Sequence, residues 1–224
     1  MKLSPFKRWL YRMDYKYNRY AIQNLTLILA AGMAIVCLGT LINPRVNLMS
    51  YLTLDRAAVF SGQVWRLFTF IFVPPTSSFY SLYGLFMTAL SIYVFYWIGT
   101  AVENSWSSLK FNFYYLIGML GAIIAAMITG FGSSLWLNTS LFLAYACLFS
   151  DQQLLLFFII PVKAKWLGWF EGGLLILYLI IGSWADRVSI LLCIANFLLF
   201  FGSDLLGGLK STIRYWKSRR QFRR

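Results

Sequence analysis

The chain alternates long apolar segments with short polar stretches, and this pattern predicts membrane-spanning helices. A transmembrane α-helix needs about 17–25 consecutive, mainly apolar residues. Five segments reach that length, at about 25–42, 79–102, 111–129, 167–184 and 188–206. Their apolar residues are continuous rather than alternating, so we predict helices and reject a transmembrane β-barrel.

A sixth apolar segment starts near Leu135 and must end by Phe149, because Ser-Asp-Gln-Gln follows. It has about 15 residues, fewer than the roughly 20 that a bilayer of normal thickness requires. The pattern therefore predicts an all-α bundle of six helices whose fourth helix is unusually short.

Two other stretches are rich in apolar and aromatic residues but are too short or too charged to span a membrane. Residues 44–75 form a first loop that ends at a double proline, and its Trp and Tyr side chains favour the membrane interface. Residues 154–169 (LLLFFIIPVKAKWLGW) form a connector. An alternative joins residues 137–162 into one helix with Asp151 at its middle, where an unpaired carboxylate is costly.

The composition agrees with a polytopic membrane protein of one domain. Hydrophobic residues make up 60% of the 224 residues, and charged residues make up 12%, about half the fraction of a soluble domain. The three cysteines, Cys37, Cys147 and Cys193, all lie in apolar segments, and their spacing fits no metal site. We therefore expect no metal and no cofactor.

The net charge of +13 is concentrated near the two ends of the chain. With both termini inside, the inner side carries 16 of the 20 Lys and Arg residues: six before the first span, three in inner loops and seven in the tail. By the positive-inside rule this predicts an N-in, C-in topology. We expect the clusters to attract anionic lipid headgroups and not nucleic acid, because no nucleic-acid-binding motif accompanies them.

Two motifs resemble the rhomboid superfamily of membrane proteins. GQVWRLFTFIF in the first loop contains a Trp-Arg pair, Trp65 and Arg66, and GTAVENSWSS at the end of the second span contains Gly99 and Glu103. Rhomboids have a six-helix core with the same N-in arrangement. The resemblance implies a six-helix rhomboid-like membrane domain over residues 25–206, preceded by a basic cytosolic segment (1–24) and followed by a basic cytosolic tail (207–224).

The connector resembles that of the derlin branch of the superfamily, which has an acidic turn, aromatic residues and a Lys-Ala pair before the fifth helix. Here Asp151, Phe157, Phe158, Lys163 and Ala164 carry the match. Derlins are proteolytically inactive rhomboids that act on membrane-protein clients in quality control. The resemblance implies such a role for this chain.

Structural roles are expected for the other signature residues. Glu103 can accept hydrogen bonds from the backbone amides that open the next helix. Arg66 can reach phosphates or loop carbonyls while Trp65 lies at the level of the headgroups. The residues expected to pack helices closely are Gly118, Gly121 and Cys193.

Active rhomboids use a serine in a G-x-S-G turn and a histidine in the sixth helix. Ser140 occupies the serine position, but the chain contains no histidine, and the dyad histidine would fall near Ser189 or Ile190. Every lysine is expected on the other side of the membrane, and arginine is not a useful base. We predict no catalytic residue: Ser140 is a vestigial position near the start of a short helix that Asn138 or Thr139 caps.

The expected function is a non-proteolytic, derlin-like protein that binds membrane-protein clients. Its short fourth helix would thin the bilayer and open a lateral face between the second and fifth spans. One alternative is a rhomboid-type intramembrane serine protease with Ser140 as nucleophile and an unrecognised base. Another is a small transporter or scaffold unrelated to rhomboids, which would lack a first-loop Trp-Arg segment beside the second span. We expect no charged residue in the middle of a span, where a transporter usually has one.

The expected partners are the lipid bilayer with its anionic headgroups and the client proteins, and the oligomeric state is left open. The expected location is a multi-pass position in a membrane, with the plasma membrane of a bacterium preferred over an endomembrane.

Overall fold

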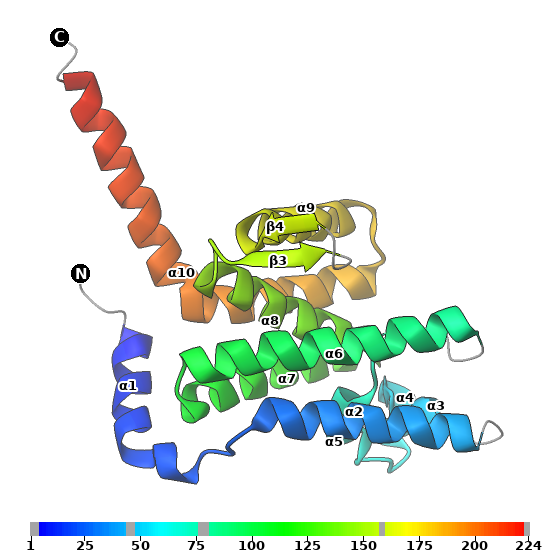
Figure 1. Cartoon of the computed structure of the whole chain (residues 1–224). Coiled ribbons are helices and arrows are strands. Elements are labelled where there is room, and N and C mark those ends of the chain that lie inside the picture. The colour runs from blue at the N-terminus through cyan, green and yellow to red at the C-terminus, as the bar shows by residue number, and fades with distance from the viewer. Residues whose placement is uncertain (1–4, 44–47, 76–80, 157–159, 222–224) are drawn as a thin grey trace.

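Helices make up 81% of the residues that the structure describes, and five of these helices are long and apolar enough to cross a membrane. The computed structural model describes the backbone of residues 5–43, 48–75, 81–156 and 160–221, and the side chains of residues 8–43, 48–75, 81–154 and 161–202. The prediction of an all-α polytopic membrane protein is confirmed (Figure 1).

The long apolar helices lie close to the predicted spans. They are α2 (Leu25–Ile42), α6 (Leu82–Ser105), α7 (Ser108–Thr129), α9 (Ala164–Ile181) and the first half of α10 (Trp184–Gln221). The short helix α8 (Leu135–Leu148) has 14 residues, as expected for the fourth apolar segment. Helix α10 continues through most of the residues predicted as a separate tail. No proline interrupts that stretch, and basic residues near a helix C-terminus are favourable, so the helix continues through the weak helix formers Gly207 and Gly208.

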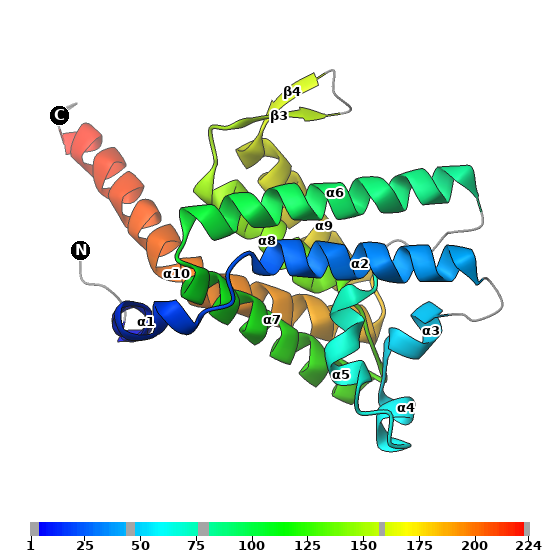
Figure 2. The same ribbon diagram turned by 60° about the horizontal axis from the view of Figure 1, so that its bottom comes forward.

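The shortest apolar helix, α8, occupies the centre of the bundle. It packs against α6, α7, α9 and α10, while α2 packs on α6 and α10 runs along α7 (Figures 1 and 2). Its residues Leu137, Leu141, Ala144 and Tyr145 are almost fully buried. The helix that is least able to cross a bilayer is therefore the one most enclosed by protein.

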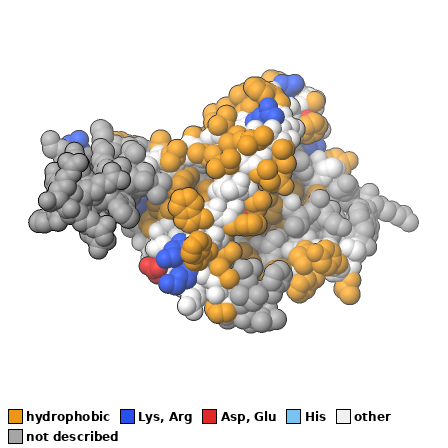
Figure 3. Space-filling model, turned by 90° about the horizontal axis from the view of Figure 1, so that it is seen from above, with side chains coloured by type: hydrophobic (Ala, Val, Ile, Leu, Met, Phe, Trp, Pro, Cys, Tyr) orange, Lys and Arg blue, Asp and Glu red, His pale blue; other side chains and the backbone are white. Residues whose placement is uncertain are grey.

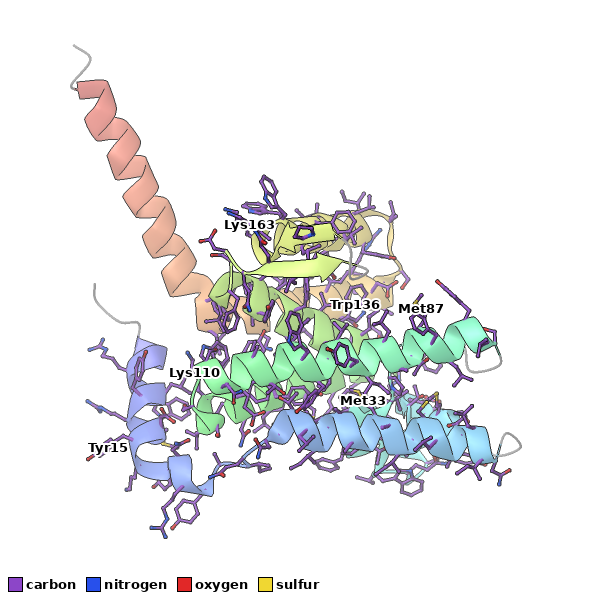
Figure 4. All side chains as sticks on the ribbon, viewed as in Figure 1. Tyr15, Met33, Met87, Lys110, Trp136 and Lys163 are labelled. Carbon is purple, nitrogen blue, oxygen red and sulfur yellow. The ribbon has the colours of Figure 1, made fainter. Side chains whose placement is uncertain are left out.

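Successive helices run in alternating directions, so the α6–α7 turn lies at the end of the bundle where α1 (Pro5–Tyr17) is found (Figure 1). Figure 4 places Lys110 at this end and Met87 toward the opposite end. Alternation is what a multi-span topology requires. The six-span count and the N-in, C-in topology stay predictions.

The N-terminal segment is helical and docks on the start of α7. The ring of Trp9 lies edge-on to that of Phe113, with 5.6 Å between centroids. In the following 3-10 turn η1 (Asn18–Tyr20), the Oδ1 of Asn18 accepts a hydrogen bond from the Leu109 amide at 3.2 Å. The basic segment is thus joined to the membrane domain by packing as well as by the chain.

The first loop folds into short elements that pack mainly against α2 and α7. These are α3 (Leu48–Leu52), β1 (Leu54–Asp55), α4 (Arg56–Phe60), α5 (Arg66–Thr69) and η2 (Phe70–Phe72). Strand β1 pairs antiparallel with β2 (Phe131–Gly132), the turn between α7 and α8. The loop is thus bound mainly to the first and third long helices, and its residues Met49 and Val73 also pack in one cluster with Leu85 and Ile92 of α6, the second span.

Arg66 holds this loop together from within. Its guanidinium is buried and donates to the backbone oxygens of Ser50 at 2.6 Å and Thr53 at 2.8 Å, and to the Gln63 side chain at 2.7 Å. Of the two partners considered for Arg66, phosphates and loop carbonyls, the structure shows carbonyls. Trp65 beside it is half exposed, as an interfacial side chain would be.

The connector after α8 is a β-hairpin, with β3 (Gln153–Leu156) antiparallel to β4 (Ile160–Lys163). The alternative of one helix over residues 137–162 is therefore wrong. Proline at position 161 cannot continue a helix, and the carboxylate of Asp151 is exposed at the hairpin base, 3.9 Å from Lys163 and 3.4 Å from Lys165. Phe157 and Phe158 lie outside the described residues.

Large hydrophobic side chains cover the outside of the bundle, which is the pattern of a lipid-facing surface. Ile35, Phe86, Ile176 and Leu191 are each more than half exposed. Figure 3 shows one such face, where the described side chains are mostly hydrophobic and the basic ones form small patches.

Glu103 and Gly99 join α6 to the start of α2. The Glu103 carboxylate is buried and accepts hydrogen bonds from the amides of Leu25 at 2.9 Å and Thr26 at 3.1 Å, and from the Thr26 hydroxyl at 2.8 Å. Asn24, the residue before α2, provides no side-chain cap, so the cap comes from α6. We expected Glu103 to bind the next helix along the chain. That was wrong, because it caps the first span.

One turn earlier on α6, Gly99 has no side chain, so α2 can come close enough for Glu103 to bind its first amides. A Cβ at position 99 would lie 2.5 Å from Cγ2 and 3.0 Å from Oγ1 of Thr26. The G-x-x-x-E spacing therefore has a local physical reason: the glycine admits α2, and the glutamate caps it.

We predict that Gly99→Ala lowers stability by about 1–3 kcal/mol, because the new methyl group overlaps Thr26. Adding Thr26→Ser removes the overlapping Cγ2 but keeps the hydroxyl that Glu103 binds, so the double variant should regain part of the loss. Thermal unfolding in detergent measures all three variants. If the losses from Gly99→Ala and Thr26→Ser simply add, the proposed contact is not the cause.

Candidate functional site

Ser140 belongs to a buried polar cluster that joins α7, α8 and α10. The Tyr114 hydroxyl donates to the Ser140 backbone oxygen at 2.7 Å, and the hydroxyls of the two residues share a short hydrogen bond. The Asn196 amide donates to Ser140 Oγ at 3.3 Å and to the Tyr114 backbone oxygen at 3.4 Å. All three side chains are at least 96% buried.

This cluster gives Ser140 a structural environment. Its described hydrogen-bond partners are a phenol, an amide and the thiol of Cys193, and none of these is a good base for an alcohol at neutral pH. The α10 residue that contacts it is Asn196 and not Ser189, the place expected for a dyad histidine; Ser189 instead donates to the Ala185 backbone oxygen. Sequence reasoning missed Asn196, although an asparagine within an apolar span is a recognisable signal.

The predicted caps of the short helix are also wrong. Helix α8 begins at Leu135, where the Ser133 hydroxyl accepts from the Leu135 amide at 3.1 Å. Asn138 and Thr139 therefore lie within its first two turns and not before it. Both residues line the groove between α6, α8 and α9 that is described below.

Close packing around the cluster depends on Gly118 more than on Gly121. A Cβ at Gly118 would lie 2.8 Å from the Asn196 amide nitrogen and would also overlap Leu137. A Cβ at Gly121 would make an ordinary contact with Leu192 at 3.7 Å. Cys193 is 6% exposed and contacts Ser140, so it lies in the packed interface between α8 and α10.

The second polar cluster lies in a groove between α6 and α9, both of which pack on α8. The groove has a volume of about 240 Å³. Its apolar lining residues are Val94, Phe95 and Ile98 from α6, Leu135, Leu141 and Phe142 from α8, and Pro75 at the end of the first loop. Figure 1 shows α6 and α9 on either side of α8.

Four polar residues line the same groove: Ser91, Asn138, Thr139 and Glu171. Glu171 is partly buried and accepts a hydrogen bond from the Thr139 hydroxyl. It is the eighth of the 18 residues of α9, so its carboxylate lies near the middle of a membrane-spanning candidate. An ionisable group at this depth is a marker of function.

The expectation of no charged residue in the middle of a span is therefore wrong, and with it the argument that it made against a transporter. The signal was present in the sequence, because Glu171 falls within the predicted fifth span, 167–184. The structure starts the helix three residues earlier, at Ala164, which moves the carboxylate closer to the middle of the span.

The signature residues predicted from sequence lie away from this groove. Gly99 and Glu103 hold α2, Arg66 holds the first loop, and Asp151 pairs with lysines at the hairpin base. They build the bundle. The side chains available to a ligand are those between α6, α8 and α9.

No protein-family model, curated protein or solved structure matches the chain. The fold defines an integral, polytopic helical membrane protein with a mainly apolar groove in its side that contains four polar residues.

Two adjacent tyrosines on α7 provide a matched test of the Ser140 cluster. Tyr114 and Tyr115 are both buried, but the Tyr115 hydroxyl has no hydrogen-bond partner among the described residues. Tyr114→Phe should cost about 1 kcal/mol of stability, because it leaves Ser140 groups unsatisfied, whereas Tyr115→Phe should be neutral or stabilising. Unfolding in detergent checks the pair, and equal effects would contradict the assignment.

Proposed function

We propose that this chain is a non-proteolytic, rhomboid-like protein of the derlin type that receives a transmembrane helix of a client protein in the groove between α6 and α9. Six spans with both termini inside, and a role in membrane-protein quality control, are parts of this proposal. The single observation that carries it is the mainly apolar groove at membrane depth, lined also by four polar residues and open between two helices that pack on a third.

The length of α8 supports a locally thin bilayer. Its 14 residues extend about 21 Å at 1.5 Å per residue, against a hydrocarbon core of about 30 Å. Because α8 is otherwise enclosed by helices, its shortness acts on the bilayer only where the groove between α6 and α9 opens α8 to lipid. A client helix with polar residues is less costly to hold in a thinner and wetter membrane.

The packing of α9 supports entry from the side. Only 11% of its apolar window is buried, the smallest share among the five long helices. It approaches α8 closely at Gly168, where a Cβ would lie 2.7 Å from Ala146, but Cβ atoms at Gly172 and Gly173 would meet nothing within 4 Å. The face of α9 at Gly172 and Gly173 thus has room beside it, while farther along the helix Leu175 is buried and Tyr178 contacts Trp136 of α8.

The environment of Ser140 supports a non-proteolytic function. A serine nucleophile needs a base and an accessible hydroxyl, whereas Ser140 is fully buried among Tyr114, Asn196 and Cys193 in a chain without histidine. The protease alternative predicts covalent labelling by a fluorophosphonate that is lost in Ser140→Ala. The present proposal predicts no labelling that depends on Ser140.

A defined peptide tests client binding. The full-length protein, with a photocrosslinking amino acid at Val94 in the groove, is reconstituted with a biotinylated Leu/Ala helix that has one central asparagine. The matched control places the crosslinker at Ile124, which is exposed on α7 away from the groove. We expect about fivefold more crosslinking from Val94, which corresponds to roughly 1 kcal/mol for an interhelical polar contact.

Equal crosslinking from positions 94 and 124 would mean that the peptide meets the protein only by collision in the lipid. The groove would then not be a client site, and the proposal would be wrong.

A further inference from the structure

We propose that Glu171 makes the groove selective for client helices that carry a lysine or arginine at the depth of this carboxylate. The inference rests on the function proposed above and adds the chemical class of the client. It follows from a mismatch between hydrogen-bond acceptors and donors in the groove.

The groove offers acceptors that the chain itself does not fully use. Glu171 accepts from the Thr139 hydroxyl, and among the described residues it has no ion pair. The described basic residues at the start of α9, Lys163 and Lys165, lie with Asp151 at the hairpin base. The carboxylate in the groove is therefore left without a cation from these neighbours.

The other polar groups of the groove add to the same excess. The Oδ1 of Asn138 is buried and has no hydrogen-bond partner among the described residues. The Ser91 hydroxyl donates its proton to the Thr88 backbone oxygen at 2.8 Å, so it can offer only lone pairs to the groove. These neutral acceptors call for a donor, and only the Glu171 carboxylate beside them calls for positive charge as well.

The remaining surface specifies a membrane helix as the carrier of that charge. The apolar lining from α6 and α8 suits the methylene stem of a lysine or arginine, whose head then reaches Glu171. Gly172 and Gly173 follow the carboxylate on α9 and leave open space, which lets another helix backbone come close. A lysine or arginine is costly to place in a bilayer, and so is an unpaired carboxylate. In the groove the client residue and Glu171 would form an ion pair that lowers the cost of both.

The test uses the full-length protein in phosphatidylcholine vesicles with the crosslinker at Val94. Three Leu/Ala peptides differ only at the central residue, which is lysine, asparagine or leucine. We expect the lysine helix to crosslink about tenfold more than the asparagine helix, as strong interhelical polar contacts allow. Glu171→Gln should reduce that ratio to about one, because a neutral amide no longer favours the ammonium group over an uncharged donor.

Asp151→Asn is the matched control, because it removes one carboxylate that is 79% exposed and lies outside the groove. It should keep the preference for lysine. Glu171→Lys provides a second arm that does not depend on Glu171→Gln folding well: it should invert the preference, favouring a peptide with central glutamate. A monodisperse elution profile of each variant shows that it is folded.

The outcomes separate the two proposals. A lysine preference that survives Glu171→Gln overturns the inference, while a Val94 signal above that of Ile124 still supports client binding. Equal signals from positions 94 and 124 reject the groove as a client site. Loss of the lysine preference when phosphatidylethanolamine is added would assign the carboxylate to a lipid amine and overturn the inference as well.

Discussion

The constraint on which this structure depends is that a polar group within a bilayer must find its partner inside the protein. Glu103 meets it by capping α2 from a neighbouring helix, and Ser140 meets it through Tyr114 and Asn196. Each of these contacts joins helices that are distant along the chain. Polar groups thereby determine which helices lie side by side in a molecule whose outer and inner surfaces are both apolar.

Against this background Glu171 is unusual. It lies in the middle of a span, and its described partner is the Thr139 hydroxyl, a neutral donor. Asn138 in the same groove has an unpaired oxygen. Satisfied groups elsewhere explain how the bundle is held, and the unsatisfied ones mark the place where another molecule completes the structure. Helix α9, which carries Glu171, has the smallest buried share of the five long helices. It therefore also leaves room for another molecule beside the carboxylate.

Hydrophobic length predicted the helices well. The apolar segments gave the bounds of α2 without error and those of α6, α7 and α9 within three residues at each end, and they gave the shortness of α8. Errors arose where a residue's role depends on a distant partner. Glu103 caps a helix that precedes it by 78 residues, and Asn196 meets Ser140 across 56 residues. The connector was also misjudged in type, because its apolar run does not by itself distinguish a packed coil from a hairpin.

By itself the sequence determined that the chain is a polytopic helical membrane protein, where its helices run, and that no histidine is available to activate Ser140. These properties follow from local composition, because burial in lipid depends on the length and apolarity of each segment alone. Only the tertiary structure decided that α8 is central, that the first loop lies on α2 and α7, and that Ser91, Asn138, Thr139 and Glu171 share one groove. Neighbours in space are chosen by packing and hydrogen bonding between segments, and no single segment contains that information.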